Sequence, residues 1–116
     1  MKNEKLQKLN KNLYEVSEKQ VKNQRDIITN EQSEQHLEEI SRKYRRIFDR
    51  LFCSWNKDKE FVNWLNMANT ELLHHNRKVS FNLENQREKL LRERKYLNEL
   101  ENDLYDQKRS LLREVK

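Results

Sequence analysis

Apolar residues in the first half of the chain recur at alternating steps of three and four residues. This is the heptad spacing of a helix that packs lengthwise against another helix. The series is apolar near both ends and polar between residues 20 and 34. Its members are Leu6, Leu9, Leu13, Val16, Gln20, Asn23, Ile27, Asn30, Glu34, Leu37, Ser41, Tyr44, Phe48, Leu51 and Trp55. The pattern predicts one long helix over about residues 3–53.

The second half of the chain carries a similar series, which slips in register near Val79 and Leu83 and again nearer its end. Such slips indicate local unwinding of a coiled coil. The members are Phe61, Leu65, Ala68, Leu72, His75, Val79, Leu83, Gln86, Leu90, Arg94, Leu97, Leu100, Leu104, Lys108, Leu111 and Val115. A second helix over about residues 58–114 is therefore expected.

The break between the two series, residues 53–60, contains three good N-cap residues, Ser54, Asn56 and Asp58. Two architectures fit this break: a continuous rod, or a hairpin that turns near Asn56 and Lys57. In a hairpin, facing residues have numbers that add up to about 113. This register pairs Leu9 with Leu104, Leu13 with Leu100 and Val16 with Leu97. The match favours the hairpin, and antiparallel self-pairing of straight rods is the alternative.

The predicted fold is all-α: one domain, residues 1–116, forming a coiled-coil-like antiparallel hairpin with its turn near residues 54–58. Two helices cannot bury all the apolar residues, particularly the aromatic ones near the turn. Two stripes of apolar residues spaced seven apart also lie outside the paired positions. The first is Tyr14, Val21 and Ile28. The second is Leu91, Tyr105 and Leu112, with the polar Asn98 at the position between Leu91 and Tyr105. Exposed stripes of this kind call for a partner helix. We therefore predict a four-helix bundle, formed as a homodimer or a heteromer.

The composition narrows the possible folds and functions. The 116 residues include no Gly and no Pro, and 39% of them are charged. Turn-rich β-folds and the glycine loops that bind phosphates in Rossmann or P-loop proteins are thereby excluded. The first residues do not resemble a signal peptide, and no stretch is apolar enough to span a membrane. A soluble cytoplasmic protein is expected, with export by a route without a cleaved signal left open.

No catalytic, metal-binding or cofactor-binding site is predicted. His74 and His75 are adjacent on a helix and point about 100° apart, so they cannot easily share a metal ion with His36. Cys53 has no second cysteine and no neighbouring histidine, and we expect it to be a small apolar filler near the turn. A two-helix hairpin also lacks a cleft in which an acid or base could be desolvated. The chain is therefore expected to be non-enzymatic.

A basic run over residues 42–50 follows an acidic run over residues 31–39. Its cations are Arg42, Lys43, Arg45, Arg46 and Arg50. A DNA-reading basic region would be longer and would lack the apolar residues that interleave here. The preferred interpretation is a solvated face or a docking patch for an acidic partner, and nucleic-acid binding is the weaker alternative.

Two tryptophans flank the turn, Trp55 before it and Trp64 after it. A large aromatic residue at such a turn can close the end of a helical bundle. It can also serve as an anchor for a partner, because tryptophan is enriched in binding hot spots. Both interpretations are open at this point.

The hairpin with the turn sequence Ser54-Trp55-Asn56-Lys57 resembles the WXG family of small type VII secretion proteins. That family keeps Gly where this chain has Lys57. Its C-terminal export signal, a tyrosine followed four residues later by an acid, is absent, because Arg109 follows Tyr105 at that distance. Tyr14 and Glu18 have this spacing, but at the other end of the chain.

These departures suggest an accessory protein more than a self-exported family member. The resemblance implies a targeting factor or chaperone that binds the helical domain of an LXG-type toxin. Its partner-binding residues would be the two stripes together with Trp55 and Trp64. The alternative is a homomeric coiled-coil protein, structural or nucleic-acid-binding through residues 42–50.

Overall fold

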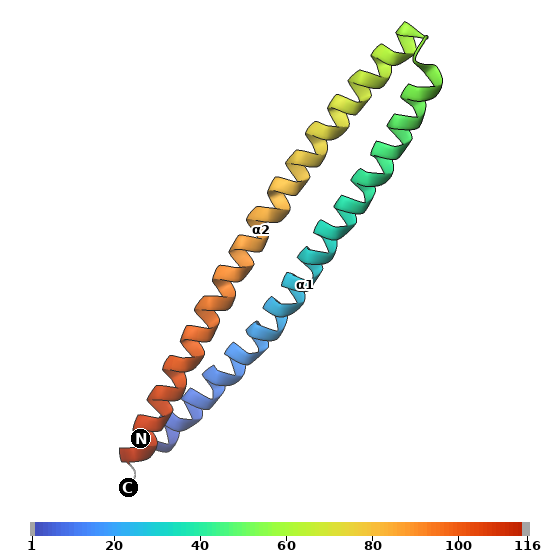
Figure 1. The fold of residues 1–116 in the computed structure, drawn as a ribbon. Coiled ribbons are helices and arrows are strands. Elements are labelled where there is room, and N and C mark those ends of the chain that lie inside the picture. The colour runs from blue at the N-terminus through green and yellow to red at the C-terminus, as the bar shows by residue number, and fades with distance from the viewer. Residues whose placement is uncertain (1, 115–116) are drawn as a thin grey trace. The chain divides into compact units, whose positions relative to one another are not determined.

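The chain forms an all-α antiparallel hairpin, as predicted (Figure 1). The computed structural model describes residues 2–114, and these contain no strand. Helix α1 spans Lys2–Trp55 and helix α2 spans Lys59–Glu114. Neither segment contains a Gly or Pro to interrupt its backbone hydrogen bonds, so each helix runs without a break for more than 50 residues. The chain turns back instead of continuing as a single rod.

The turn lies at residues 56–58, inside the predicted region. The backbone N–H of Asp58 donates to the carbonyl oxygen of Trp55 at 3.1 Å and closes the turn. The side chain of Asp58 then caps α2, because its Oδ1 accepts a hydrogen bond from the N–H of Phe61 at 3.1 Å. No residue in the described part of the chain has a positive φ angle. Capping therefore produces this reversal without a left-handed residue.

The structure divides into two compact units, each an antiparallel pair of helical segments. Unit 1 comprises Met1–Thr29 and Arg87–Lys116, and unit 2 comprises Asn30–Gln86. In Figure 1 unit 1 brings the blue start of α1 beside the red end of α2. Here the ammonium group of Lys2 donates to the carbonyl oxygen of Glu114 at 2.9 Å. A cation is well placed there, because the last carbonyl groups of a helix carry partial negative charge.

The core of unit 1 contains the pairs that the predicted register places opposite one another. Val16, Leu97 and Leu104 are buried, and Leu9, Leu13 and Leu100 pack against them. Burial of a side chain of this size contributes about 1.5–3 kcal/mol relative to its exposed state. This part of the unit 1 seam is therefore an aliphatic contact, and the mirror register predicted its pairs correctly.

Two buried asparagines also sit on the predicted register. The side-chain amide of Asn23, in unit 1, donates to the carbonyl oxygen of Leu90 at 2.9 Å. The amide of Asn30, in unit 2, makes the same contact with Leu83 at 3.1 Å and also donates to Glu34 at 2.8 Å. Both pairs have residue numbers that add up to about 113. A polar residue in an otherwise apolar seam favours one register, because other registers would leave it unpaired.

The seam of α2 differs from the predicted series at several positions. His75, Gln86 and Arg94 are exposed, and Asn76 takes the half-buried position expected for His75. With Asn76 in the seam, its members continue at steps of seven as Leu83, Leu90, Leu97, Leu104 and Leu111. The predicted slip near Val79 and Leu83 is therefore wrong. The sequence pattern favoured the histidine because the apolar positions alone could not distinguish two adjacent polar residues. Val115 lies outside the described residues.

Candidate functional site

Six exposed apolar side chains form the apolar face of unit 1. They are the two predicted stripes: Tyr14, Val21 and Ile28 of α1, and Leu91, Tyr105 and Leu112 of α2. Their exposed fractions run from 38% for Leu91 to 66% for Tyr14. Scattered exposed apolar residues are ordinary, but repeated ones on one side of a helix form a candidate interaction surface.

Helical geometry places both stripes on the same side of unit 1. Each member directly follows a seam residue, as Ile28 follows Ile27 and Leu112 follows Leu111. Two antiparallel helices are related by an approximate twofold axis perpendicular to the plane that contains them. Equivalent heptad positions therefore lie on the same side of the pair. A hydrogen bond of 3.1 Å from Gln20 to Asn98, the polar member of the α2 stripe, links this side of α2 to α1.

One ionisable group on the apolar face has a shifted pKa. A hydrogen bond to the Glu18 carboxylate and its negative charge raise the pKa of the Tyr14 phenol above 10.0. The two residues are four apart, so they are neighbours along one side of α1. The tyrosine-to-acid spacing noted in the sequence thus corresponds to a physical contact. That contact favours the neutral form of the phenol.

An aromatic cluster surrounds the turn in unit 2. The ring of Phe61 lies 5.5 Å from that of Trp55 and 5.9 Å from that of Trp64, measured between centroids. Aromatic pairs at such distances attract one another beyond their burial. Trp55 nevertheless stays 53% exposed and Trp64 60% exposed. Both tryptophans are therefore held in place by Phe61 and still offer most of their surface to solvent.

The remaining residues considered for chemistry are exposed. His36, His74 and His75 are exposed, and the free thiol of Cys53 is exposed instead of filling a gap near the turn as expected. Cys53 is the third residue from the end of α1, and its side chain is exposed there. Within residues 2–114 no group of three or more His, Cys, Asp or Glu side chains is arranged to hold a metal ion.

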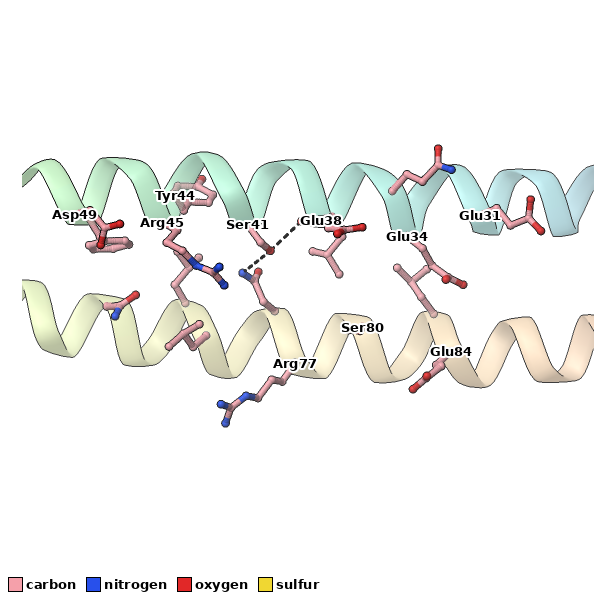
Figure 2. A pocket seen from close by; sticks show the side chains of 18 of the residues that line it. Glu31, Glu34, Glu38, Ser41, Tyr44, Arg45, Asp49, Arg77, Ser80 and Glu84 are labelled. Atoms are coloured by element: carbon pink, nitrogen blue, oxygen red, sulfur yellow. Dashed lines mark hydrogen bonds between the residues drawn. The ribbon is translucent and has the colours of Figure 1, made fainter.

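The basic run of α1 is exposed but partly neutralised. Arg42, Lys43, Arg45, Arg46 and Arg50 are all exposed in terms of their accessible surface. Arg42 forms an ion pair of 2.7 Å with Glu38, so the acidic and basic runs contact each other within one helix. Arg45 instead lies toward α2 (Figure 2). The five cations therefore do not form one uniform patch.

A groove of about 780 Å³ opens between the two helical segments of unit 2 (Figure 2). The sequence did not indicate it. At its centre the amide of Asn76 donates to the hydroxyl of Ser41 at 3.1 Å, and that hydroxyl donates to the Leu37 carbonyl at 2.9 Å. Ser41 and Asn76 are smaller than the leucines of the unit 1 seam. Their side chains therefore leave part of the space between the two helical segments unfilled. Small polar residues at consecutive seam layers are the signal that could have revealed the groove.

The comparison with protein families covers both helices and the turn. A family model described as a protein of unknown function, DUF3958, matches residues 4–111. The chain belongs to this family. No curated protein and no solved structure matches the DUF3958 chain. Neither helix, within residues 2–114, has an apolar stretch long enough to cross a membrane.

Proposed function

We propose that this DUF3958 chain is a non-enzymatic helical adaptor that binds the helical domain of a secreted toxin and targets it for type VII secretion. The apolar face of unit 1 carries the proposal. Its members recur every seven residues on two antiparallel segments, a pattern that suits a partner helix lying along the same direction. Seating such a helix would remove six apolar side chains from water and complete a bundle.

The turn region supports binding of a partner by a second route. Trp55 and Trp64 are rigid aromatic side chains held by Phe61 and largely exposed. Aromatic anchors of this kind contribute strongly to interfaces because they lose little conformational freedom on binding. Their position next to the turn is also where the WXG family keeps its tryptophan. This agreement supports a WXG-like role.

The contacts of the tyrosines support an accessory role over self-export. At the C-terminal end, Arg109 follows Tyr105 by four residues and pairs with Asp106 on its own helix. The tyrosine–acid contact that does form, between Tyr14 and Glu18, is at the N-terminal end. In this proposal the toxin supplies the export signal, and the adaptor makes the toxin's helical domain recognisable to the secretion machinery.

The proposal is tested by co-expression with a neighbouring LXG-type protein, followed by size-exclusion chromatography. The wild-type pair should co-elute, and Tyr14→Glu with Leu112→Glu should abolish the complex, because two carboxylates would be buried against apolar partner surface. Circular dichroism should be unchanged, since both side chains are exposed. The control Thr29→Glu with Ser110→Glu adds the same charge at exposed positions outside the stripes and should leave co-elution intact.

Two results would contradict the proposal. The first is persistent failure to co-elute with every neighbouring protein that has a long helical domain. The second is loss of helicity in the Tyr14 and Leu112 variant, which would assign these residues to the core. Salt-sensitive binding of DNA or RNA that depends on Lys43, Arg46 and Arg50 would instead favour the alternative role.

A further inference from the structure

The groove of unit 2 has a charge opposite to that of the whole chain. The chain carries a net charge of +5. The groove is lined by five carboxylates, those of Glu31, Glu34, Glu38, Asp49 and Glu84. Two cations, Arg45 and Arg77, line it as well, and Glu38 is paired with Arg42, so the carboxylates still outnumber the cations. In Figure 2 Glu34 and Arg45 lie between the helices, whereas Arg77 points away from α1. An acidic depression on a basic protein is a local feature that selects a basic ligand.

The floor of the groove is apolar and incompletely packed. Leu37, Phe48, Leu72 and Leu83 line it and are only half-buried. The Ser41–Asn76 hydrogen bond spans the centre, where the seam of unit 1 has leucines. Protein interiors are normally packed without gaps of this size. An apolar side chain inserted above Ser41 would gain contacts on several sides and remove the floor from water.

Both walls of the groove are continuous helices, which limits the shape of the ligand. Their backbone N–H and C=O groups are bonded within the helices, so an extended peptide would find no strand edge to pair with. The α1 wall runs from Glu31 to Phe52, a rise of roughly 30 Å at 1.5 Å per residue. A partner helix of about six turns matches that length and packs between two helices by the usual ridge-and-groove contacts.

We propose that the groove of unit 2 binds one amphipathic helix of another protein, with an apolar side chain above Ser41 and Asn76 and Lys or Arg side chains against the rim carboxylates. The chain's own basic run is a weaker occupant, because Arg42 is already paired with Glu38. This inference goes beyond the adaptor role, since the groove and the apolar face belong to different units and share no residue. It would give the adaptor a second, chemically distinct contact.

The test uses the full chain and two synthetic amphipathic peptides of the same length. Both carry leucine at the seam positions; one has lysine at the flanking positions and the other has glutamate. Binding of the labelled peptides is followed by fluorescence anisotropy. We expect the lysine peptide to bind at least about ten-fold more tightly than the glutamate peptide, and its affinity to fall as salt is added.

Two variants of the chain locate the binding site. Glu31→Lys with Glu38→Lys should weaken binding of the lysine peptide by at least about ten-fold. Glu15→Lys with Glu99→Lys makes the same charge change on exposed positions of unit 1 and should have no effect beyond a small general repulsion. Ser41→Leu should abolish binding by filling the groove without changing any charge. Ser33→Leu, at an exposed position of the same helix, is its matched control.

Four results would overturn the proposal. They are the absence of lysine-peptide binding, equal binding of both peptides, binding that survives Ser41→Leu, and a chain that is itself a dimer until Ser41→Leu separates it. The last result would identify a second copy as the occupant. Circular dichroism on each variant checks that the helices are retained. Co-elution with a toxin tests the apolar face of unit 1. If co-elution fails, the peptide-binding results still decide the proposal for the groove of unit 2.

Discussion

The two units of this hairpin use their apolar residues in opposite ways. All four phenylalanines and both tryptophans lie in unit 2. Yet of the buried apolar residues described, only Leu65 belongs to unit 2; Val16, Ile27, Leu90, Leu97, Leu104 and Leu111 belong to unit 1. Unit 1 has mainly aliphatic side chains in its seam, where two helices can enclose them, and Asn23 is the buried polar exception. Burial in a two-helix pair thus depends on the continuity of the seam more than on apolar content.

The difference also explains why each unit exposes a different kind of surface. In unit 1 the seam residues bury one another and the stripe residues remain exposed. The exposed stripes form an apolar face with a seven-residue repeat. Unit 2 interrupts its seam with Ser41 and Asn76, which yields a groove with an acidic rim. The first surface suits a flat helix-to-helix contact, and the second suits insertion of a side chain. One architecture therefore presents two different candidate binding surfaces.

The largest expected effect is loss of a leucine from the unit 1 seam. Leu97 is 3% exposed and belongs to the core cluster, so Leu97→Ala should lower the free energy of unfolding by about 2–5 kcal/mol. Leu73→Ala makes the same change in unit 2 at a residue that is 43% exposed, and should cost less than about 1 kcal/mol. Urea unfolding followed by circular dichroism measures both. Equal costs would contradict the difference in enclosure between these two leucines.

An intermediate effect is expected at the buried asparagines. The side-chain oxygen of Asn30, Oδ1, is buried without a hydrogen-bond partner. Asn23 donates its amide to the Leu90 carbonyl and has no buried side-chain atom in this unpaired state. Asn30→Leu should therefore raise the free energy of unfolding by about 1–3 kcal/mol, and Asn23→Leu should raise it less. The same urea experiment compares the two.

The cost of these substitutions should appear as a loss of register. A seam without asparagines tolerates slipped pairings, because no polar group is left unpaired when the helices shift. The double variant Asn23→Leu with Asn30→Leu should show broadened or duplicated amide signals in nuclear magnetic resonance spectra. A single sharp set of signals would assign the register to the turn alone.

The smallest effect concerns Tyr14. Because its pKa is raised above 10.0, the contact with Glu18 stabilises the folded state below about pH 10 and is lost as pH rises through the folded-state pKa. Glu18→Gln should lower the pKa of Tyr14 toward 10.0, which a spectroscopic titration of the phenol detects. Glu15→Gln, at an exposed neighbouring position, is the control. An unchanged pKa in the Glu18 variant would remove that carboxylate as the cause.

Much of the fold could be predicted because heptad periodicity is a local property of the sequence. The hairpin, the turn at residues 56–58 and the pairing of Leu9, Leu13 and Val16 with the end of α2 all followed from spacing and mirror symmetry. The sequence did not show whether His75 or Asn76 occupies the seam, because both residues are polar and they are adjacent. Cys53 was wrongly assigned to the interior because its exposure depends on which side of α1 faces α2.

The sequence by itself determined the element type, the single turn and the existence of surplus apolar stripes. Because the chain lacks Gly and Pro, an α-helix is the regular structure that its composition favours. The seven-residue repeat then indicates which residues lie on the same side of each helix. Only the tertiary structure decided how far each side chain is enclosed and where packing fails. The groove at Ser41 and Asn76 is a property of the space between two helices, and that space depends on the sizes of facing residues 35 positions apart in the chain.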